Sequence, residues 1–354
     1  MPDVTEGAVM QALSGVEDPE LHRDIVSLDM VRDLKLQGAS VSMTLMLTTP
    51  ACPLTESFKA SVEDALLGVP GVESVEVSLD AEVRSFKGAS ERKPVEGVKN
   101  IIAIASNKGG VGKSTVASNL AIALAKHGAS VGLLDADITG PNIPTMMGFE
   151  AGFMAQDEGG LRPQERYGVR VCSIGFALPK GTPVVWRGPM IGTAVRDFLH
   201  NISWGDLDYL IVDLPPGTSD ASMSMVQEAP IAGAVVVSTP QNVAIEDATK
   251  AVGMFDRLQV PVFGIVENMS YFVAPDTGNV YEIFGHGGAA QAAEDLGLEF
   301  LGEVPLDQAT REASDAGMPV TERSPDSPAA RAFMAVAEKI AARCSVQNYL
   351  EESA

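Results

Sequence analysis

A run of glycines, lysines and hydroxyl residues, KGGVGKST at 108–115, carries the clearest chemistry in the sequence. Its glycines allow backbone N–H groups to point at phosphate oxygens. Lys113 can neutralise β- and γ-phosphate charge, and the Ser114 hydroxyl can ligate Mg²⁺. The run therefore predicts a cradle for ATP with Mg²⁺. The predicted nucleotide-binding residues of the run are Gly109, Gly110, Val111, Gly112, Lys113, Ser114 and Thr115.

The segments on either side of this run support the prediction. An apolar strand pattern at Ile101–Ala105 precedes it, and helical spacing from Ser114 to Lys126 follows. The dipole of that helix adds positive potential at its N-terminus. Asn107 stands where the usual G-x-x-x-x-G-K-[ST] pattern has its first glycine. The alternative interpretation is a glycine-rich strand-to-helix turn with an incidental lysine.

Aspartates end two further apolar strands. SVGLLDADITGPN carries Asp135 and Asp137 at a spacing of two, and Asp213 follows the apolar residues of YLIVDLPPGTSD. Parallel strands bring such residues to the carboxyl edge of the sheet, where ligands bind in doubly wound folds. We expect Asp213 to bind Mg²⁺ through water. Of Asp135 and Asp137, one can join the metal shell and the other can orient the attacking water. Each aspartate could instead cap a helix or form a turn.

The order of the predicted elements divides the chain into two domains. After residue 98, apolar strands alternate with helices, which predicts an α/β fold with a doubly wound, mostly parallel sheet at 99–345. Residues 1–85 predict a small α+β domain, in which VSMTLMLTT is a half-buried strand. The polar segment 86–98 contains Gly and Pro and predicts a linker. Residues 346–354 are expected to form a polar tail.

Composition narrows the classes of partner. The 354 residues include 45% hydrophobic residues, enough for a sizeable core, and carry a formal charge of −22. That charge repels nucleic acid and anionic lipid, so we expect neither nucleic acid nor membrane as a partner. The N-terminus lacks a secretory pattern, and the three scattered cysteines suit a reducing compartment. The cytoplasm is the expected location.

The extra lysine of the run, Lys108, gives it a specific resemblance. KGGVGKST resembles the deviant Walker A box of the MinD, ParA and NifH class of dimeric ATPases. The resemblance implies a homodimer in which Lys108 reaches the nucleotide of the other subunit. It also favours Asp137 as the residue that orients water, which leaves Asp135 with Asp213 and Ser114 in the metal set. Lys108, Lys113 and Asp137 are thus the catalytic candidates, although Lys108 could also be a solvated lysine.

Further motifs resemble one branch of this class. LLDADITGPNIPTMMG, VVWRGPM, LIVDLPPGTSD, VENMSYF and GEVPLD are similar to the Mrp/ApbC/Nbp35 family of iron-sulfur cluster carriers, and DPEL with TTPACPL resembles the small MIP18-like domain of assembly factors. The resemblance implies that Asn268 reads the adenine edge, with Pro305 and Leu306 packed on the base. Asn268 could alternatively cap a turn. Gly217 could sense the γ-phosphate.

The sequence departs from the family at the cluster ligands. Many members have C-x-x-C after ENMSYF, whereas Ala274 and Thr277 occupy those positions here. Cys52 matches the characteristic cysteine of the small domain and is the remaining candidate ligand for an iron-sulfur cluster. A helix N-terminus close to Cys52 could lower the pKa of its thiol, but an ordinary buried cysteine is an equal alternative. Cys344 could join a ligand set, and His286 is expected to be a loop residue.

Three functions are consistent with these observations. The leading hypothesis is an ATP-hydrolysing carrier that assembles iron-sulfur clusters and transfers them to apo-proteins, with assembly factors as further partners. The second is a MinD- or ParA-like positioning ATPase, which the acidic charge and the absence of a basic amphipathic tail disfavour. The third is an ATP-dependent assembly adaptor that binds no cluster itself.

Overall fold

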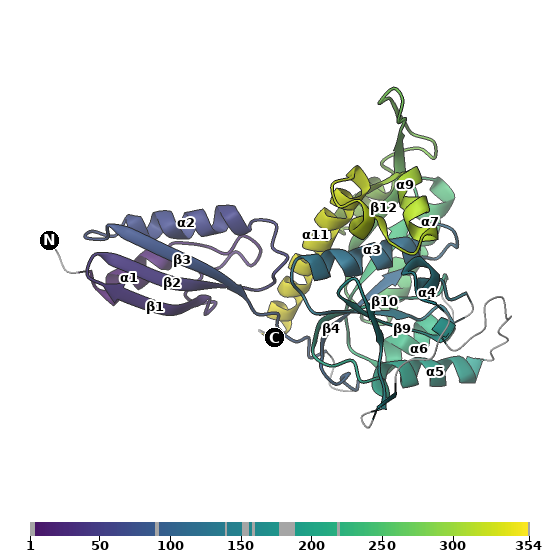
Figure 1. Ribbon diagram of the computed structural model, residues 1–354, viewed down its shortest axis with the longest axis horizontal. Coiled ribbons are helices and arrows are strands. Elements are labelled where there is room, and N and C mark those ends of the chain that lie inside the picture. Colours follow the sequence, from purple (N-terminus) through teal and green to yellow (C-terminus); the bar gives the residue numbers. More distant parts are fainter. Residues whose placement is uncertain are drawn as a thin grey trace.

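The described part of the chain contains two main β-sheets that share no strand. A computed structural model describes residues 4–88, 92–138, 140–150, 156–157, 160–176, 188–217 and 220–352. The smaller sheet has three strands and lies towards the N-terminus, whereas the larger has nine. Between them, the described residues of 82–97 form neither helix nor strand, and the two sheets occupy opposite ends of the molecule (Figure 1).

The small sheet has the order β1-β2-β3, with β2 antiparallel to β1 and parallel to β3. Alternate residues of β2, from Val41 to Leu47, are buried, as a strand with one covered face requires. The covering helices bury Val9, Leu13, Phe58, Val62 and Leu66. The elements are α1 (Glu6–Leu13), β1 (Val31–Gln37), β2 (Ser40–Leu47), α2 (Thr55–Leu67) and β3 (Ser74–Ala81).

The large sheet has the order β13-β12-β11-β4-β10-β5-β9-β8, and β14 also pairs with β12. Only β8 and β13 pair antiparallel with their neighbours, so the prediction of a doubly wound, mostly parallel sheet is confirmed. Its strands are β4 (Val98–Ala105), β5 (Val131–Asp135), β8 (Gln164–Arg166), β9 (Val169–Ser173), β10 (Leu207–Asp213), β11 (Ile231–Ser238), β12 (Val262–Val273), β13 (Val280–Tyr281) and β14 (Phe300–Leu306). A separate short hairpin pairs β6 (Gln156–Asp157) with β7 (Gly160–Leu161).

Helices cover both faces of this sheet. They are α3 (Lys113–Lys126), α4 (Ile143–Met146), α5 (Gly188–His200), α6 (Asp220–Glu228), α7 (Asn242–Arg257), α8 (Gly288–Asp295), α9 (Gln308–Asp315), α10 (Val320–Arg323) and α11 (Pro328–Glu352), with a 3-10 turn at Ile174–Phe176. Ile102 and Ile104 of β4 face α3 and α11, whereas Ile101 and Ala103 face the side of α5 and α6. This alternation makes β4 a central strand that is buried on both faces.

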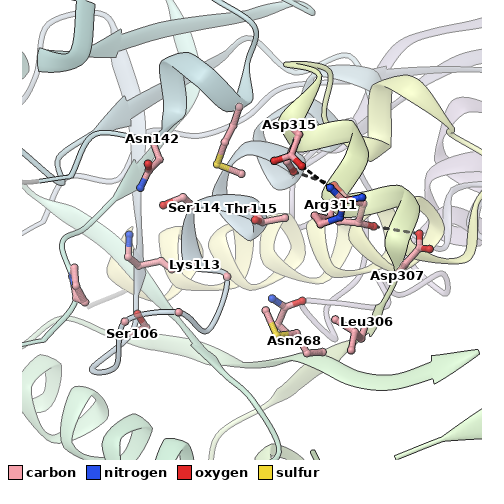
Figure 2. A pocket seen from close by; sticks show the side chains of 18 of the residues that line it. Ser106, Lys113, Ser114, Thr115, Asn142, Asn268, Leu306, Asp307, Arg311 and Asp315 are labelled. Carbon is pink, nitrogen blue, oxygen red and sulfur yellow. Dashed lines mark hydrogen bonds and ion pairs between the residues drawn. The ribbon is translucent and has the colours of Figure 1, made fainter. Parts of the chain in front are cut away.

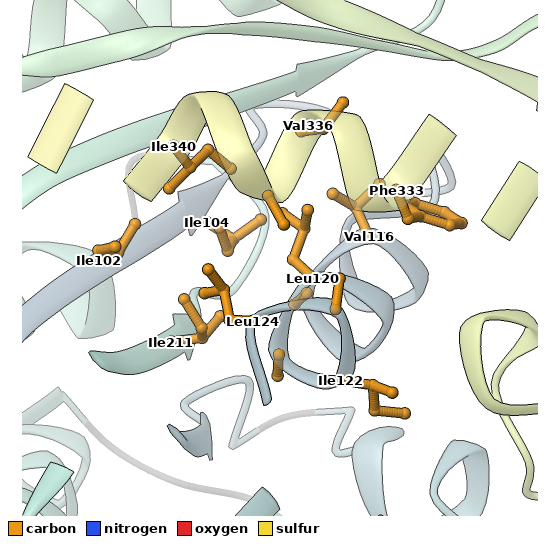
Figure 3. Packing of buried hydrophobic residues seen from close by; sticks show 14 of the residues in the cluster. Ile102, Ile104, Val116, Leu120, Ile122, Leu124, Ile211, Phe333, Val336 and Ile340 are labelled. Carbon is orange, nitrogen blue, oxygen red and sulfur yellow. The ribbon is translucent and has the colours of Figure 1, made fainter. Parts of the chain in front are cut away.

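The packing of α3 against α11 forms the largest core (Figure 3). Figure 3 shows the α11 side chains over the first helix after the phosphate run and over the strands beneath it. The contacting residues include Val116, Leu120, Leu124, Phe333, Val336 and Ile340. Cys344 of α11 belongs to this core and is 1% exposed, so the idea that it joins an accessible ligand set is wrong.

The expected polar tail from residue 346 is not a tail, because α11 continues to Glu352. Asn348 is buried and donates to the Arg84 carbonyl and to Asn100 Oδ1, both at 2.9 Å. Tyr349 packs against the core of the small sheet, and the Arg23 guanidinium lies 5.3 Å from its ring centroid. These polar groups are paired with residues far away in the sequence, which local composition does not reveal.

Candidate nucleotide-binding site

The run KGGVGKST forms the turn between β4 and α3, as predicted. Gly110 has φ +85° and Gly112 has φ +83°, backbone conformations that favour glycine. A Cβ added at Gly112 would lie 2.2 Å from Asn268 Nδ2. That amide also donates to the Val111 carbonyl at 2.8 Å. The loop therefore has glycines where its shape requires them, and Asn268 fixes it from β12, two strands away from β4.

Lys113, Ser114 and Asp213 are brought together at the carboxyl edge of the sheet. Lys113 Nζ donates to Asp213 Oδ1 at 2.5 Å, and Ser114 Oγ donates to Asp213 Oδ2 at 2.5 Å. Asp213 is completely buried, and burial raises the pKa of its carboxyl while Lys113 opposes that shift. Ser114 and Asp213 offer the hard oxygen ligands that Mg²⁺ prefers, so their arrangement fits the ion.

Asp135 and Asp137 occupy different environments although they are two residues apart. Asp135 is completely buried and accepts hydrogen bonds from Ser173 Oγ at 2.9 Å and from the Ile143 amide at 3.3 Å. Burial and the charge of Asp213 raise its pKa well above the usual range. Asp137 lines the cavity described below, and its Oδ1 accepts from the Gly140 amide at 3.2 Å. Asp135 thus lies beneath the site rather than on its surface.

A cavity of about 590 Å³ lies over these groups (Figure 2). Most of the predicted residues line it, including Lys108, Gly109, Asp137, Asn268, Pro305 and Leu306. In Figure 2, Lys113 and Ser114 lie at one end of the view and Arg311 lies at the other, with its ion pair to Asp315. The volume is in the range of small-molecule sites.

Sequence reasoning missed two walls of this cavity. One is α4 with Asn142 before it, and the other is α9, whose Arg311 pairs with Asp315 at 2.6 Å. Asp307 caps α9 by accepting from the Ala309 amide at 3.1 Å. An aspartate at this position, directly after the strand sequence GEVPL, is a common N-cap and could have predicted the start of α9. The four-residue α4 offers no periodicity from which to predict it.

The remaining phosphate-site candidates lie at the edge of the cavity. Lys108 is half-buried, and its carbonyl accepts from Ser106 Oγ at 3.1 Å. The Gly217 amide donates to the Ser106 carbonyl at 2.9 Å, which joins the end of the β10 segment to the phosphate loop. Of the motifs quoted above, residues 139, 184–187, 218 and 219 lie outside the described part of the chain.

The environment of Cys52 contradicts the expected thiol activation. Burial and the nearby Glu20 carboxyl raise the pKa of Cys52 to about 12, and the Leu54 amide lowers it by less. Cys52 Sγ donates to Glu20 Oε1 at 3.4 Å, and burial raises the pKa of Glu20 to about 7. Cys172 is completely buried, as expected for a core residue. Cys52 is the one cysteine of the three with appreciable exposure.

In the described residues, no helix combines the length and apolar character that crossing a membrane requires.

Two family models cover most of the chain. Residues 97–341 match the family described as NUBPL iron-transfer P-loop NTPase, and residues 6–79 match the family described as iron-sulfur cluster assembly protein. An iron-sulfur cluster carrier protein from Synechocystis sp. is 48% identical over 97% of this chain and 99% of its own length. One from Deinococcus radiodurans is 49% identical over 97% of each chain.

Solved structures agree with the fold. A nucleotide-binding protein from Archaeoglobus fulgidus, in complex with ADP and with cobalt found in it, aligns with a TM-score of 0.59 and 42% identity, covering 66% of this chain and 91% of that one. The Pyrococcus furiosus cell division ATPase MinD aligns with a TM-score of 0.53 and 24% identity, covering 68% of this chain and 98% of its own. The chain belongs to the NUBPL-type iron-transfer P-loop NTPase family and carries an N-terminal iron-sulfur cluster assembly domain.

Proposed function

We propose that this protein is a Mg²⁺-dependent ATPase that carries iron-sulfur clusters to apo-proteins in the cytoplasm. The observation that carries the ATPase part is the shared contact of Lys113 and Ser114 with the buried Asp213, beneath a cavity at the carboxyl edge of the sheet. A cation, a hydroxyl and a carboxylate that meet at this edge support phosphate and Mg²⁺ binding there. The Archaeoglobus fulgidus protein, in complex with ADP, supports the same use of the cavity.

The residues of the site have separate tasks in hydrolysis. Glycine amides of the loop and Lys113 would hold the β- and γ-phosphates, which requires Lys113 to exchange its contact with Asp213 for phosphate oxygens. Ser114 and Asp213 would hold Mg²⁺, which neutralises phosphate charge when bound. Asp137 lines the cavity and would orient the attacking water. For Asp135, whose carboxylate accepts a hydrogen bond from Ser173, a positioning role beneath the cavity replaces the metal role expected from the sequence.

The base would bind at the opposite end of the cavity. Asn268, Pro305 and Leu306 line the cavity together with residues of α9, and in Figure 2 Arg311 of α9 lies away from Lys113. Since Asn268 also contacts the phosphate loop, base and phosphate recognition share one side chain. Lys108 would act across a homodimer by stabilising charge on the nucleotide of the partner subunit.

The cargo part rests on Cys52 and on the carriers from Synechocystis and Deinococcus. Thiolates are the usual cluster ligands, and only Cys52 is accessible among the three cysteines. Its raised pKa means that a cluster must displace the thiol proton, for which the adjacent Glu20 carboxylate is an acceptor. One thiol per chain also favours a cluster shared between two copies or with a client protein.

Anaerobic reconstitution with iron and sulfide tests the cargo. The wild type should bind a cluster by visible absorption and by iron and sulfide content, and Cys52→Ala should lose it. Cys344→Ala is the matched control, because that cysteine is buried in the core and should not matter. If the wild type hydrolyses ATP but binds no cluster, the carrier role is contradicted and the protein is instead an assembly adaptor.

A further inference from the structure

Two glutamates stand opposite each other behind the base end of the cavity. Glu267 of β12 and Glu303 of β14 are direct partners in the register of these parallel strands. Glu267 is completely buried. Like charges opposite each other on adjacent strands repel, and a buried carboxylate needs compensation. The pair therefore calls for a positive group on this face of the sheet.

The neighbours of the pair supply only one such group. His286 Nε2 lies 2.8 Å from Glu303 Oε2, and this hydrogen bond raises the pKa of His286. Ser270 Oγ donates to Glu267 Oε1 at 2.6 Å and lies 3.1 Å from Glu303 Oε2. A third carboxylate, Glu282, lies 3.9 Å from His286 Nδ1. Within the described residues, no lysine or arginine forms an ion pair with any of these three glutamates.

Backbone contacts explain only part of the arrangement. The amides of Gly287 and Ala289 donate to Glu267 at 3.0 and 2.8 Å, which fixes the start of α8. These bonds account for the burial of Glu267, whereas the Glu303 side chain has, among the described residues, only the contacts with Ser270 and His286 given above. One ligand atom each from Glu267, His286 and Glu303 lies within 4.8 Å of the others.

The geometry points to a binding site for one divalent first-row transition-metal ion, held by Glu267, Glu303 and His286. Two carboxylates and an imidazole are nitrogen and oxygen ligands suited to such ions, and bonds of about 2.0–2.2 Å need only a small closure of the three atoms. Glu303 and His286 can supply that closure, since their side chains are 38% and 40% exposed. The set offers three ligand atoms for one ion and contains no thiolate, so it differs chemically from a cluster site on Cys52.

The position of this site connects it to the nucleotide cavity. Glu267 precedes Asn268, and Glu303 lies two residues before Pro305, both of which line the cavity. An ion would join β12 to β14 just below the hairpin of β12 and β13 that projects from the body in Figure 1. The inference does not depend on ATP hydrolysis or cluster transfer.

Titration of the full-length, tag-free, chelator-treated chain with Co²⁺ tests the site, with excess Mg-ADP present to occupy the phosphate site. Visible absorption and calorimetry should report one high-affinity Co²⁺ per chain. Affinity should fall about tenfold or more in His286→Ala and in Glu303→Gln, by the loss of a ligand. Both side chains are partly exposed, so these variants should fold, which circular dichroism checks.

His127→Gln is the matched control, because His127 faces one glutamate, Glu338, at 3.4 Å. Its Co²⁺ affinity should equal that of the wild type. The proposal is overturned if the wild type binds no Co²⁺ above the level of His286→Ala, or if His127→Gln loses as much affinity as His286→Ala does.

Discussion

Asp213 is the residue on which the phosphate site depends, because its buried carboxylate accepts from both Lys113 and Ser114. Removing one member of a buried ion pair leaves the other uncompensated, whereas an exposed pair contributes little. The same helix offers both cases. Lys113, the first residue of α3, forms the buried ion pair with Asp213. Lys126, the last residue of α3, forms a partly exposed ion pair with Glu322 at 2.8 Å.

Lys113→Ala should therefore abolish tight ATP binding and lower the free energy of unfolding by about 3 kcal/mol or more. Lys126→Ala should change it by less than about 1 kcal/mol and leave binding unchanged. Calorimetric ATP titration and urea denaturation measure the two effects. Equal stability loss in both variants would contradict the role given to the buried pair.

Glu20 predicts a pH dependence of stability. Burial raises its pKa from the ordinary 4.5 to about 7, so the folded protein binds more protons than the unfolded chain between these values. The contribution of Glu20 to the free energy of unfolding is therefore fully present below about pH 4.5 and is lost as the pH rises through about 7. The loss is on the order of 2–3 kcal/mol. Glu20→Gln should remove that component and stabilise the small domain at pH 8.

The measurement is urea denaturation of wild type and Glu20→Gln at pH 5 and pH 8. Glu17→Gln, at an exposed position three residues earlier, is the control and should follow the wild type. Parallel pH profiles for wild type and Glu20→Gln would show that Glu20 is not the titrating group.

Among the elements, α11 connects the two sheets. Its N-terminal part packs on α3, and its last turns reach the core of the small sheet through Tyr349. Asn348, beside Tyr349, binds Arg84 of the segment between the sheets and Asn100 of β4. Asn348→Ala would leave the buried Asn100 Oδ1 without this donor and should lower the free energy of unfolding by about 1–3 kcal/mol. Gln347→Ala, one residue earlier and partly exposed, is the control and should change it by less than about 0.5 kcal/mol. Thermal and urea unfolding report the difference, and equal effects would contradict the account.

The strands and the phosphate loop were predictable because their signals are local. Apolar runs identify β4, β5 and β10, and the glycine spacing identifies the turn that Gly112 makes. The rest depends on distant partners. Asn348 looks polar and free in sequence, although its partner Asn100 lies 248 residues away. The pKa of Cys52 is raised by burial and by Glu20, 32 residues earlier, and these effects outweigh the Leu54 amide at the start of α2.

At the scale of the molecule, the predicted homodimer depends on contacts between two subunits, with Lys108 acting on the nucleotide of the partner subunit. Lys108 lines the cavity but makes no side-chain contact with Asp213, so its loss should spare the phosphate site of its own subunit. Lys108→Ala should keep ATP affinity within about threefold while lowering kcat by at least about a hundredfold, as expected for a charge that acts in trans. Lys250→Ala, an exposed lysine paired with Asp247, is the control and should keep full activity. Normal turnover by Lys108→Ala would contradict the trans role.

Cluster transfer is the most direct test of an ATP-driven carrier. Protein reconstituted anaerobically would be mixed with an apo acceptor, with and without Mg-ATP, and the gain of acceptor absorption followed. The wild type should deliver its cluster at a rate that Mg-ATP changes several-fold, and Lys113→Ala should deliver it at a rate that Mg-ATP leaves unchanged. A wild type whose transfer is the same with and without Mg-ATP, or that holds no cluster to transfer, would contradict the proposed function.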